Sequence, residues 1–358
     1  MSAGKIRVLV VDDSVFYRVA LPRMLRTAPD IEVVDIAKDG AEALEKVRRL
    51  APDVITLDII MPVMDGLTTL KKLMDENPLP VVMLSSLTKR GAEETIECLS
   101  IGAVDFVAKP DGEPKPGIIT AITNELVTKV RAAATSTPHP RRIAAEPTRP
   151  LGMAPARPVK QRDAIIAIVA STGGPSALQG LVPALPADLP VPVVICQHMA
   201  VEFLEALTRS LNNASHLEML IPPPQTILEA GTVYITSFQQ RPILRRRAGR
   251  LFIEGGAGTE APANMFLESV SQTCPGRACG VILTGMGSDG AQGLLAIRKS
   301  GGLTIAQDRD SSLLFGMPAR AAELGAAELV LPLSAMPEAI VRFAENLADK
   351  RDKGLAMP

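Results

Sequence analysis

Short apolar runs alternate with amphipathic stretches along the first 130 residues of the chain. The apolar runs have the length of strands, are rich in β-branched side chains, and are separated by segments with apolar residues at helical spacing. The predicted strands are Ile6–Val11, Glu32–Ile36, Val54–Leu57, Val81–Leu84 and Val104–Val107. Ala41–Leu50 and Ala92–Ile101 show the helical spacing, and Gly102 follows the second segment, where a helix is expected to end. Repeated strand–helix units predict a doubly wound parallel sheet of the (βα)5 type, with helices on both faces.

The same alternation resumes after residue 162. The predicted strands here are Ala164–Ala170, Val191–Cys196, Gly280–Leu283, Leu303–Ala306 and Glu328–Leu331. The predicted helices are Pro175–Ala184, Phe203–Leu211, Met265–Thr273, Ala291–Ser300 and Ala335–Leu347. Between Glu218 and Glu254 there is no helical period, and this segment is predicted to be β-hairpin. The second region is therefore expected to be another doubly wound, mostly parallel α/β domain that carries a β-hairpin.

A Pro- and Arg-rich segment separates the two regions. Ala132–Arg162 contains six prolines, six Lys or Arg residues and a single acidic residue, with no aromatic side chain. Such a composition has too little apolar surface to offset the entropy of ordering, which is typical of a linker. We therefore predict a first domain at 1–128, a linker at 129–162, a second domain at 163–352 and a tail at 353–358.

The composition narrows the class of protein. The 38 Lys and Arg residues nearly balance 39 Asp and Glu residues, and Trp is absent, so no nucleic-acid partner is predicted. No apolar run approaches the roughly 18 residues of a membrane span, so no membrane insertion is expected. The four cysteines form no CxxC pair, which favours reduced thiols and a cytoplasmic location.

Charged and hydroxyl residues follow the predicted strands of the first domain. Asp12 and Asp13 follow the first strand, and Asp58 follows the third. Ser85 and Lys109 follow the fourth and the fifth. The carboxyl ends of parallel strands meet at one edge of the sheet, where three carboxylates would repel one another unless a cation such as Mg²⁺ were bound. Asp58 is then a candidate phosphoryl acceptor, with Mg²⁺ and Lys109 neutralising the oxygens of the transferred group.

Three motifs of the first domain can be compared with known families. They are Val8-Leu9-Val10-Val11-Asp12-Asp13-Ser14, Asp58-Ile59-Ile60-Met61-Pro62-Val63-Met64-Asp65-Gly66 and Lys109-Pro110. Together they resemble the receiver domain of two-component response regulators, over residues 5 to about 128. The resemblance implies that a histidine kinase is the phosphodonor and that Asp58 is the phosphorylated residue. It also implies that Ser85 and Phe106 form a hydroxyl–aromatic switch pair, and that Lys109 belongs to the same switch.

The second domain has one serine and one histidine at the ends of predicted strands. Ser171 follows the first strand and begins the sequence Ser-Thr-Gly-Gly-Pro, a tight turn into a helix. A serine there is either a helix cap or a nucleophile beside free N–H groups. His198 follows the second strand, whereas His139 lies in the predicted linker and His216 in a polar turn. Cys196 is a rival nucleophile, but it lies inside an apolar run, where thiols are usually inert.

A glycine-rich loop follows the third predicted strand of the second domain. Thr284–Gly290 has the GxGxxG spacing of dinucleotide-binding sites, and Asp308 follows the next strand. A dinucleotide-dependent oxidoreductase is therefore one interpretation. Asp289 argues against it, because a carboxylate within the glycine turn would repel a pyrophosphate. The same carboxylate could instead orient His198, completing a candidate set of Ser171, His198 and Asp289.

Four segments of the second domain extend the comparison with known families. They are Ala170–Pro175, Gln197-His198-Met199, Leu283–Gly290 and Phe315–Pro318. With the first domain and the linker, they resemble the chemotaxis protein-glutamate methylesterase family over nearly the whole chain. The resemblance implies a phosphorylation-activated hydrolase that removes methyl esters from glutamates of methyl-accepting chemoreceptors, releasing methanol, and deamidates selected glutamines.

The same resemblance implies a role for each candidate residue. Ser171 would be the nucleophile, His198 the general base and then acid, and Asp289 the carboxylate that orients the histidine. The backbone N–H of Met286 would contribute to the oxyanion hole. No cofactor is implied for the ester chemistry, and the unphosphorylated receiver is expected to cover the catalytic face.

Three segments depart from the usual pattern of that family. Ala200-Val201-Glu202 stands where prolines and a glycine are usual, Ser237-Phe238-Gln239-Gln240 where Gly-Gly and His are frequent, and Ala261–Met265 where Arg-Pro-Ser-Val-Asp is common. These departures motivate another interpretation, in which the second domain is a non-catalytic binding module. An arginine cluster at Arg241–Arg250 flanks a predicted hairpin turn, either as solvated charge on an edge strand or as a contact for a partner.

Overall fold

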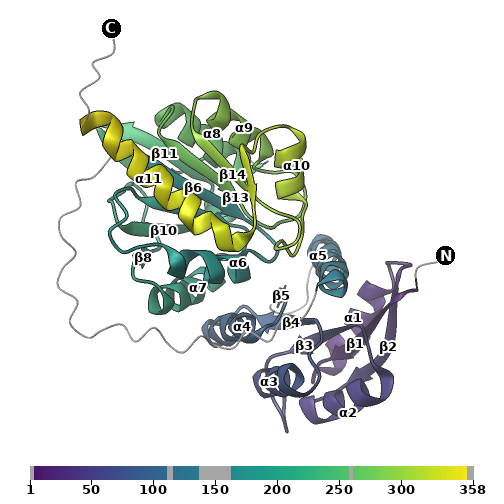
Figure 1. Ribbon diagram of the computed structural model, residues 1–358. Helices are drawn as coiled ribbons and strands as arrows, with labels where there is room; N and C mark the ends of the chain where they lie inside the picture. The colour runs from purple at the N-terminus through teal and green to yellow at the C-terminus, as the bar shows by residue number, and fades with distance from the viewer. Residues whose placement is uncertain (1–3, 111–115, 137–162, 258–260, 353–358) are drawn as a thin grey trace. The chain divides into compact units, whose positions relative to one another are not determined.

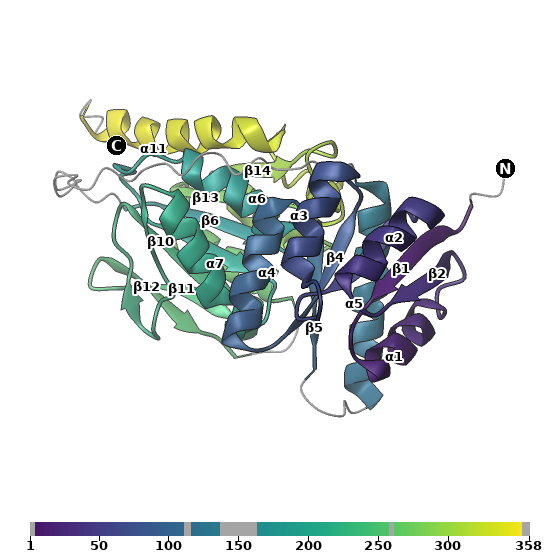
Figure 2. The same ribbon diagram turned by 90° about the horizontal axis from the view of Figure 1, so that it is seen from below.

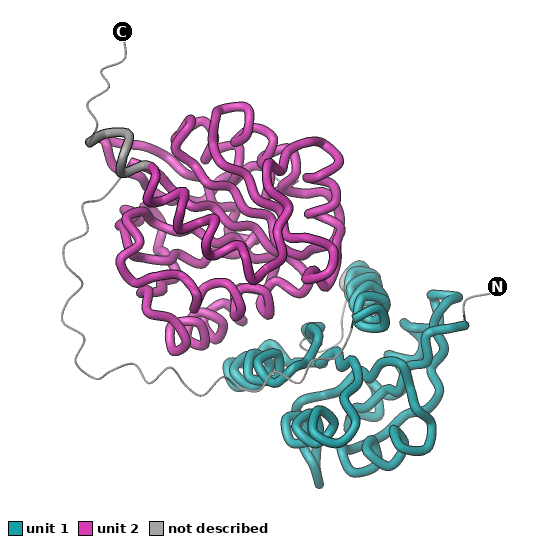
Figure 3. The backbone as a smooth tube through the Cα atoms, viewed as in Figure 1, with its two compact units in different colours: residues 1–145 teal, residues 146–358 magenta. Residues whose placement is uncertain are grey.

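A computed structural model describes residues 4–110, 116–136, 163–257 and 261–352 of the chain. The chain divides into two compact units, residues 1–145 and 146–358 (Figure 3). Each unit contains its own buried apolar cluster.

Unit 1 contains a parallel sheet with the strand order β2-β1-β3-β4-β5 (Figure 1). The strands are β1 (Ile6–Val11), β2 (Ile31–Ala37), β3 (Val54–Asp58), β4 (Val81–Ser86) and β5 (Asp105–Lys109). All four pairings are parallel. β3 is buried along its whole length because helices cover both faces, which explains its continuous apolar run. The doubly wound sheet predicted for this region is confirmed.

Helices pack on both faces of this sheet (Figure 2). They are α1 (Val15–Leu25), α2 (Gly40–Leu50), α3 (Gly66–Glu76), α4 (Lys89–Ile101) and α5 (Pro116–Thr135). Leu25 of α1 and Leu126 of α5 belong to the buried cluster that contains Val10 of β1, so these two helices share one face. α3 contacts both α2 and α4, and these three helices cover the other face.

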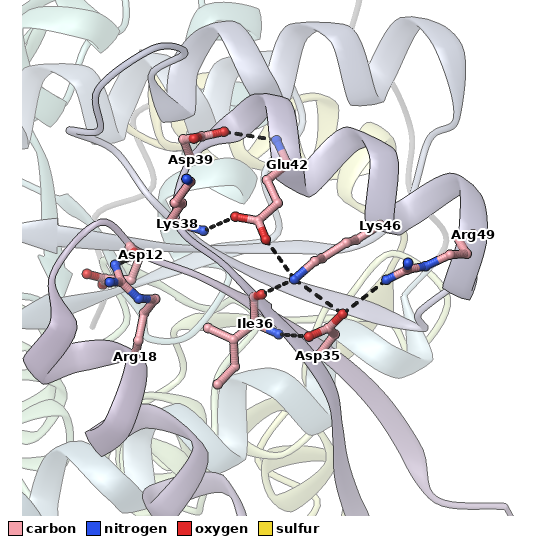
Figure 4. A network of polar contacts seen from close by, with 9 residues as sticks. All are labelled: Asp12, Arg18, Asp35, Ile36, Lys38, Asp39, Glu42, Lys46 and Arg49. Atoms are coloured by element: carbon pink, nitrogen blue, oxygen red, sulfur yellow. Dashed lines mark hydrogen bonds and ion pairs between the residues drawn. The ribbon is translucent and has the colours of Figure 1, made fainter.

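A polar network joins α2 to the edge strand β2 (Figure 4). Lys46 forms ion pairs with Glu42, at 2.9 Å, and with Asp35 of β2, at 3.2 Å. It also donates a hydrogen bond to the carbonyl oxygen of Ile36. Asp39 caps the helix, because its carboxylate accepts the N–H of Glu42 at 2.9 Å. These contacts hold α2 along the edge of the sheet.

The last helix of unit 1 extends past the predicted domain boundary. α5 continues to Thr135, and Val130 and Ala132 within it are buried. The predicted linker therefore begins too early, because residues 129–135 are helical. This segment is rich in alanine, which packs well but gives only a weak apolar periodicity. The rest of the predicted linker, from residue 137 to 162, and the predicted tail at 353–358 lie outside the described residues.

Unit 2 contains a second parallel sheet, with the strand order β15-β14-β13-β6-β7-β10-β8. The strands are β6 (Ile165–Ala170), β7 (Val193–Gln197), β8 (Glu218–Leu220), β10 (Thr232–Ser237), β13 (Ala278–Ile282), β14 (Leu303–Gln307) and β15 (Leu329–Leu331). All of their pairings are parallel. A second doubly wound, mostly parallel domain is thus confirmed.

The prediction that the whole segment from Glu218 to Glu254 forms a hairpin is wrong for β8 and β10. β10 is a buried strand of the main sheet, paired in parallel with β7. Its sequence, Thr-Val-Tyr-Ile-Thr-Ser, has polar residues at both ends and therefore lacks the continuous apolar run expected of a buried parallel strand. The polar side chains are nevertheless tolerated inside; the Thr236 hydroxyl, for example, donates to the Ile195 carbonyl at 3.1 Å.

The predicted hairpin is confirmed for the remainder of that segment. β11 (Pro242–Arg247) and β12 (Arg250–Gly255) pair in an antiparallel manner, and β9 (Thr226–Ile227) joins β12. Arg245 and Arg247 form ion pairs with Glu254 of the opposite strand, at 3.2 and 2.8 Å. These exposed ion pairs favour the interpretation of the arginine cluster as solvated charge on the hairpin.

Helices also cover both faces of the larger sheet. They are α6 (Gly174–Leu181), α7 (Val201–Ala214), α8 (Pro262–Thr273), α9 (Ala291–Lys299), α10 (Met317–Glu323) and α11 (Met336–Asp352). Val169 of β6 shares a buried cluster with Phe266 of α8 and Leu294 of α9. α11 crosses the face that is turned toward the viewer in Figure 1. α10 was not predicted, because its seven residues are too few for a clear periodicity. None of the described helices combines the length and the apolar character that crossing a membrane requires.

Candidate functional site

The candidate nucleophile lies where the sequence places it, directly after β6. Ser171 is only 5% exposed, and its backbone N–H donates to the carbonyl oxygen of Thr284 at 3.0 Å. The N–H of Gly174 closes the turn on the Ser171 carbonyl at 2.8 Å. The Ser171 Oγ lies 3.1 Å from Nδ1 of His198, which follows β7. β6 and β7 are neighbours in the sheet, so their ends bring the two side chains together.

A buried amide fixes the backbone of both residues. Nε2 of Gln197 donates to the carbonyl oxygen of Ser171 at 2.9 Å and to that of His198 at 3.2 Å. The backbone N–H of His198 donates to the Ala170 carbonyl at 2.9 Å. The sequence alone assigns no role to Gln197, since a strand-end glutamine carries no signal of its own. Its amide holds the nucleophile and the histidine in register.

Asp289 precedes α9 in the sequence, and its carboxylate lies at the start of α8. Its two carboxylate oxygens accept the backbone N–H groups of Ala263, at 3.0 Å, and Asn264, at 2.9 Å. These are N–H groups of the first helical turn, which have no partner within the helix. Asp289 thus serves as the cap that α8 lacks at Ala261, whose side chain forms no capping hydrogen bond.

The loop before Asp289 passes close to Ser171. A side chain at Gly285 would lie 2.3 Å from Sδ of Met317 and 2.8 Å from Cβ of Ser171, so only glycine fits there. Met286 is 59% exposed at the surface of this loop. Within the described part of the chain, no hydrogen bond uses the backbone N–H of Met286. This donor is therefore available to a developing oxyanion.

The rival nucleophile does not share this environment. Cys196 is fully buried within β7, and burial raises the pKa of its thiol well above the ordinary value. A thiol held in its neutral form is a poor nucleophile. The interpretation of Cys196 as a structural residue agrees with its position.

The predicted acidic residues converge at the end of the sheet in unit 1. Ligand oxygens of Asp12, Asp13 and Asp58 lie within 4.8 Å of one another. Nζ of Lys109 lies 2.7 Å from Asp12 Oδ2 and 2.8 Å from Asp58 Oδ2. Tyr17, which was not predicted, packs its ring 4.5 Å from the same Nζ. The single ammonium group of Lys109 therefore forms ion pairs with two buried carboxylates.

The electrostatics of this cluster favour a cation. Burial is the main cause that raises the pKa of Asp58 to about 6; Lys109 opposes this rise and Asp12 adds to it. Burial likewise raises the pKa of Asp12. Closely spaced carboxylate oxygens are the hard donors that Mg²⁺ prefers. The donor set therefore fits the predicted Mg²⁺.

The predicted switch residues are buried beside this cluster. Ser85 is fully buried; its hydroxyl donates to the Gly91 carbonyl at 3.1 Å and accepts a hydrogen bond from Thr95 at 2.6 Å, both in α4. Phe106 is also buried, with Lys129 Nζ 5.1 Å from its ring centroid. In this state the Ser85 hydroxyl is thus bonded to α4.

Comparisons with known proteins cover both units. A family model described as CheB methylesterase matches residues 166–340, and one described as response regulator receiver domain matches residues 8–116. A protein from Archaeoglobus fulgidus named protein-glutamate methylesterase/protein-glutamine glutaminase is 44% identical, covering 96% of this chain and 100% of its own. One of the same name from Symbiobacterium thermophilum is 42% identical, covering 94% and 96%. The chain belongs to the CheB methylesterase family.

Among solved structures, the CheB methylesterase catalytic domain of Thermotoga maritima is 32% identical, with a TM-score of 0.49, covering 51% of this chain and 98% of its own. As a CheB methylesterase, the chain is a hydrolase of chemotaxis adaptation that carries a response regulator receiver domain. The interpretations as an oxidoreductase and as a non-catalytic module are therefore set aside. The glycine-rich loop at Thr284–Gly290 passes next to Ser171, at Gly285.

Proposed function

We propose that this CheB methylesterase acts on chemoreceptor glutamates through Ser171, His198 and Asp289. The supporting observation is the 3.1 Å contact between Ser171 Oγ and His198 Nδ1 at the carboxyl edge of a parallel sheet. At this distance, Nδ1 accepts the hydroxyl proton while Oγ attacks the γ-carbonyl carbon of a glutamate methyl ester. The neutral tautomer required has its proton on Nε2.

The reaction proceeds through a γ-glutamyl ester of Ser171. When the tetrahedral intermediate collapses, His198 gives its proton to the leaving methoxide, and methanol departs. Water then attacks the ester with His198 as the base, the proton returns to Ser171 Oγ, and a glutamate carboxylate is released. A receptor glutamine follows the same steps, with ammonia as the leaving group.

Two groups stabilise the charges that develop. The backbone N–H of Met286 donates to the oxyanion of the tetrahedral intermediate, which carries the negative charge of the former carbonyl oxygen. The Asp289 carboxylate favours the imidazolium form of His198. Its hydrogen bonds to Ala263 and Asn264 support this role, because they keep the carboxylate fixed in position. The ester chemistry then needs no cofactor.

The receiver unit is proposed to control this activity through Asp58. A histidine kinase is the phosphodonor, Asp58 Oδ is the acceptor, and Asp12, Asp13 and Asp58 hold Mg²⁺. When bound, Mg²⁺ would supply positive charge to the oxygens of the transferred group. Lys109, whose Nζ contacts the carboxylates of Asp12 and Asp58, contributes a second positive charge. Ser85 and Phe106 carry the response to α4, and the whole process takes place in the cytoplasm.

Methanol release tests the proposed activity. Membranes that contain radiolabelled, methylated chemoreceptors are incubated with the phosphorylated full-length chain, and volatile methanol is measured over time. We expect release well above that of membranes alone. Binding to the membranes without any release would instead support the non-catalytic binding module.

A further inference from the structure

The imidazole ring of His198 is stacked on a phenyl ring from the neighbouring strand. β10 and β7 are parallel, and Ser237 pairs with Gln197, so the next residues, Phe238 and His198, lie side by side. Their ring centroids are 5.3 Å apart and their planes differ by 23°. This is the separation of an attractive aromatic pair. Phe238 lies in a segment that departs from the usual family pattern, where glycine is frequent.

The turn that carries Phe238 is tied to the loop of His198. The Ser237 N–H donates to Oε1 of Gln240 at 2.8 Å, and the Gln239 N–H donates to Ser237 Oγ at 3.1 Å. The Ser237 hydroxyl in turn donates to the carbonyl oxygen of Met199 at 2.6 Å. Since Met199 directly follows His198, the phenyl ring and the imidazole are held by one hydrogen-bonded assembly.

The phenyl ring cannot move away from the histidine. Phe238 is only 9% exposed and belongs to the buried cluster that contains Leu244 of β11, Val194 of β7 and Phe266 of α8. His198 itself is exposed to solvent. Any other rotamer of the imidazole would take Nδ1 away from Ser171 Oγ. The buried phenyl ring provides a rigid surface against one face of the imidazole.

We propose that Phe238 is a positioning residue that holds the His198 imidazole in the orientation needed for proton transfer to Nδ1. The inference rests on the proposed function of His198 as the general base. The face of the phenyl ring is also electron-rich, so it attracts the imidazolium that forms when His198 takes the proton of Ser171. Phe238 acts on the chemical step through His198.

Substitutions of Phe238 that either remove or keep the aromatic ring test this role. In the full-length chain, Phe238→Leu keeps an apolar side chain in the core but removes the aromatic face. We expect kcat for methanol release to fall about tenfold while KM changes less than twofold. Phe238→Tyr, which keeps the ring, should restore kcat to within about twofold of the wild type. Phe252→Leu in β12 is the matched control, because Phe252 is half-buried in the small sheet, and it should leave both constants unchanged.

The NMR spectrum of His198 provides a measurement that does not depend on turnover. The chain contains three histidines, so the imidazole C–H resonances of His198 can be assigned with a His198→Gln variant. The ring current of Phe238 should displace these resonances in the wild type and in Phe238→Tyr, and Phe238→Leu should return them toward the positions of His216. Failure of the wild type to release methanol would refute the proposed function and leave this spectral test intact.

Three results would overturn the inference. They are wild-type kcat in Phe238→Leu, a loss of kcat that Phe238→Tyr does not restore, and His198 resonances that are the same in the wild type and in Phe238→Leu.

Discussion

Oδ1 of Asp289 accepts a hydrogen bond of 2.9 Å from the backbone N–H of Asn264. The side-chain oxygen of Asn264 in turn accepts the N–H of Gly293 in α9, also at 2.9 Å. The proposed catalytic carboxylate is thereby part of a chain of contacts that fixes the first turns of two helices. Its removal should affect both the reaction and the stability of the fold.

Asp289→Asn and Asp289→Ala are expected to differ in stability while sharing a catalytic defect. Both should lower kcat for methanol release by several orders of magnitude, as substitutions of triad carboxylates do. Asp289→Ala removes both capping acceptors of α8 and should lower the free energy of unfolding by about 1–2 kcal/mol. Asp289→Asn keeps one acceptor and should lower it less. Urea unfolding followed by circular dichroism measures this difference, and equal stabilities would contradict the capping role.

Ser171→Ala and His198→Ala should each abolish methanol release without unfolding the chain. Both side chains lie at strand ends, at the edge of the apolar core, so little packing is lost. Cys196→Ala is the control: it should retain turnover, although it leaves a small cavity. The measurement is methanol release together with circular dichroism. A Ser171→Ala variant with near-native turnover, combined with an inactive Cys196→Ala variant, would reassign the nucleophile.

Gly285→Ala should lower methanol release through a steric clash alone. A methyl group there would lie 2.3 Å from Met317 Sδ and 2.8 Å from Ser171 Cβ, so the loop or the serine must shift. We expect kcat to fall at least tenfold and the free energy of unfolding to fall by about 1–3 kcal/mol. Gly255→Ala is the matched control, since its added methyl would meet only one atom, at an ordinary 3.5 Å. Equal effects of the two substitutions would exclude a special role for the close approach at Gly285.

Phosphotransfer should require Mg²⁺ and stop at Asp58. Incubation with a small labelled phosphodonor and Mg²⁺ should label the wild-type chain, and chelation of the metal should prevent labelling, because the three carboxylates need a cation before they can accept a phosphoryl group. Asp58→Asn should not be labelled. Alkali-labile label of similar extent in Asp58→Asn would place the acceptor at another residue.

The fragment from about Val159 to Pro358 should fold and hydrolyse by itself. Its buried cluster is composed of residues of unit 2, and all the proposed catalytic residues lie between 171 and 289. We expect it to release methanol faster than the unphosphorylated full-length chain at equal concentration. Asp58→Asn should keep the full-length chain at its basal rate. A folded fragment that is slower than the unphosphorylated chain would indicate that the receiver assists substrate binding.

The sequence predicts the site better than it predicts the surroundings of the site. Ser171, His198 and Asp58 are found at strand ends because a parallel sheet requires long apolar runs, and the residue after each run is easily recognised. β10 was missed as a central strand because its buried threonines are satisfied by hydrogen bonds that only the folded sheet reveals. The stacking of Phe238 on His198 depends on that pairing, so the sequence alone gave no sign of it. The helical end of α5 was missed because alanine carries little periodic signal.

The order of strands in the larger sheet has a consequence for synthesis of the chain on the ribosome. β6 lies next to β13, with Ile168 paired to Val281, so more than 100 residues must emerge between the two partners. Until then, one edge of β6 has no backbone partner and presents an apolar strand that can aggregate. The Ser171 N–H also has no Thr284 carbonyl to bind until that residue has been synthesised. The turn at Ser171 is therefore completed only when β13 inserts, and β6 is exposed to aggregation during that interval.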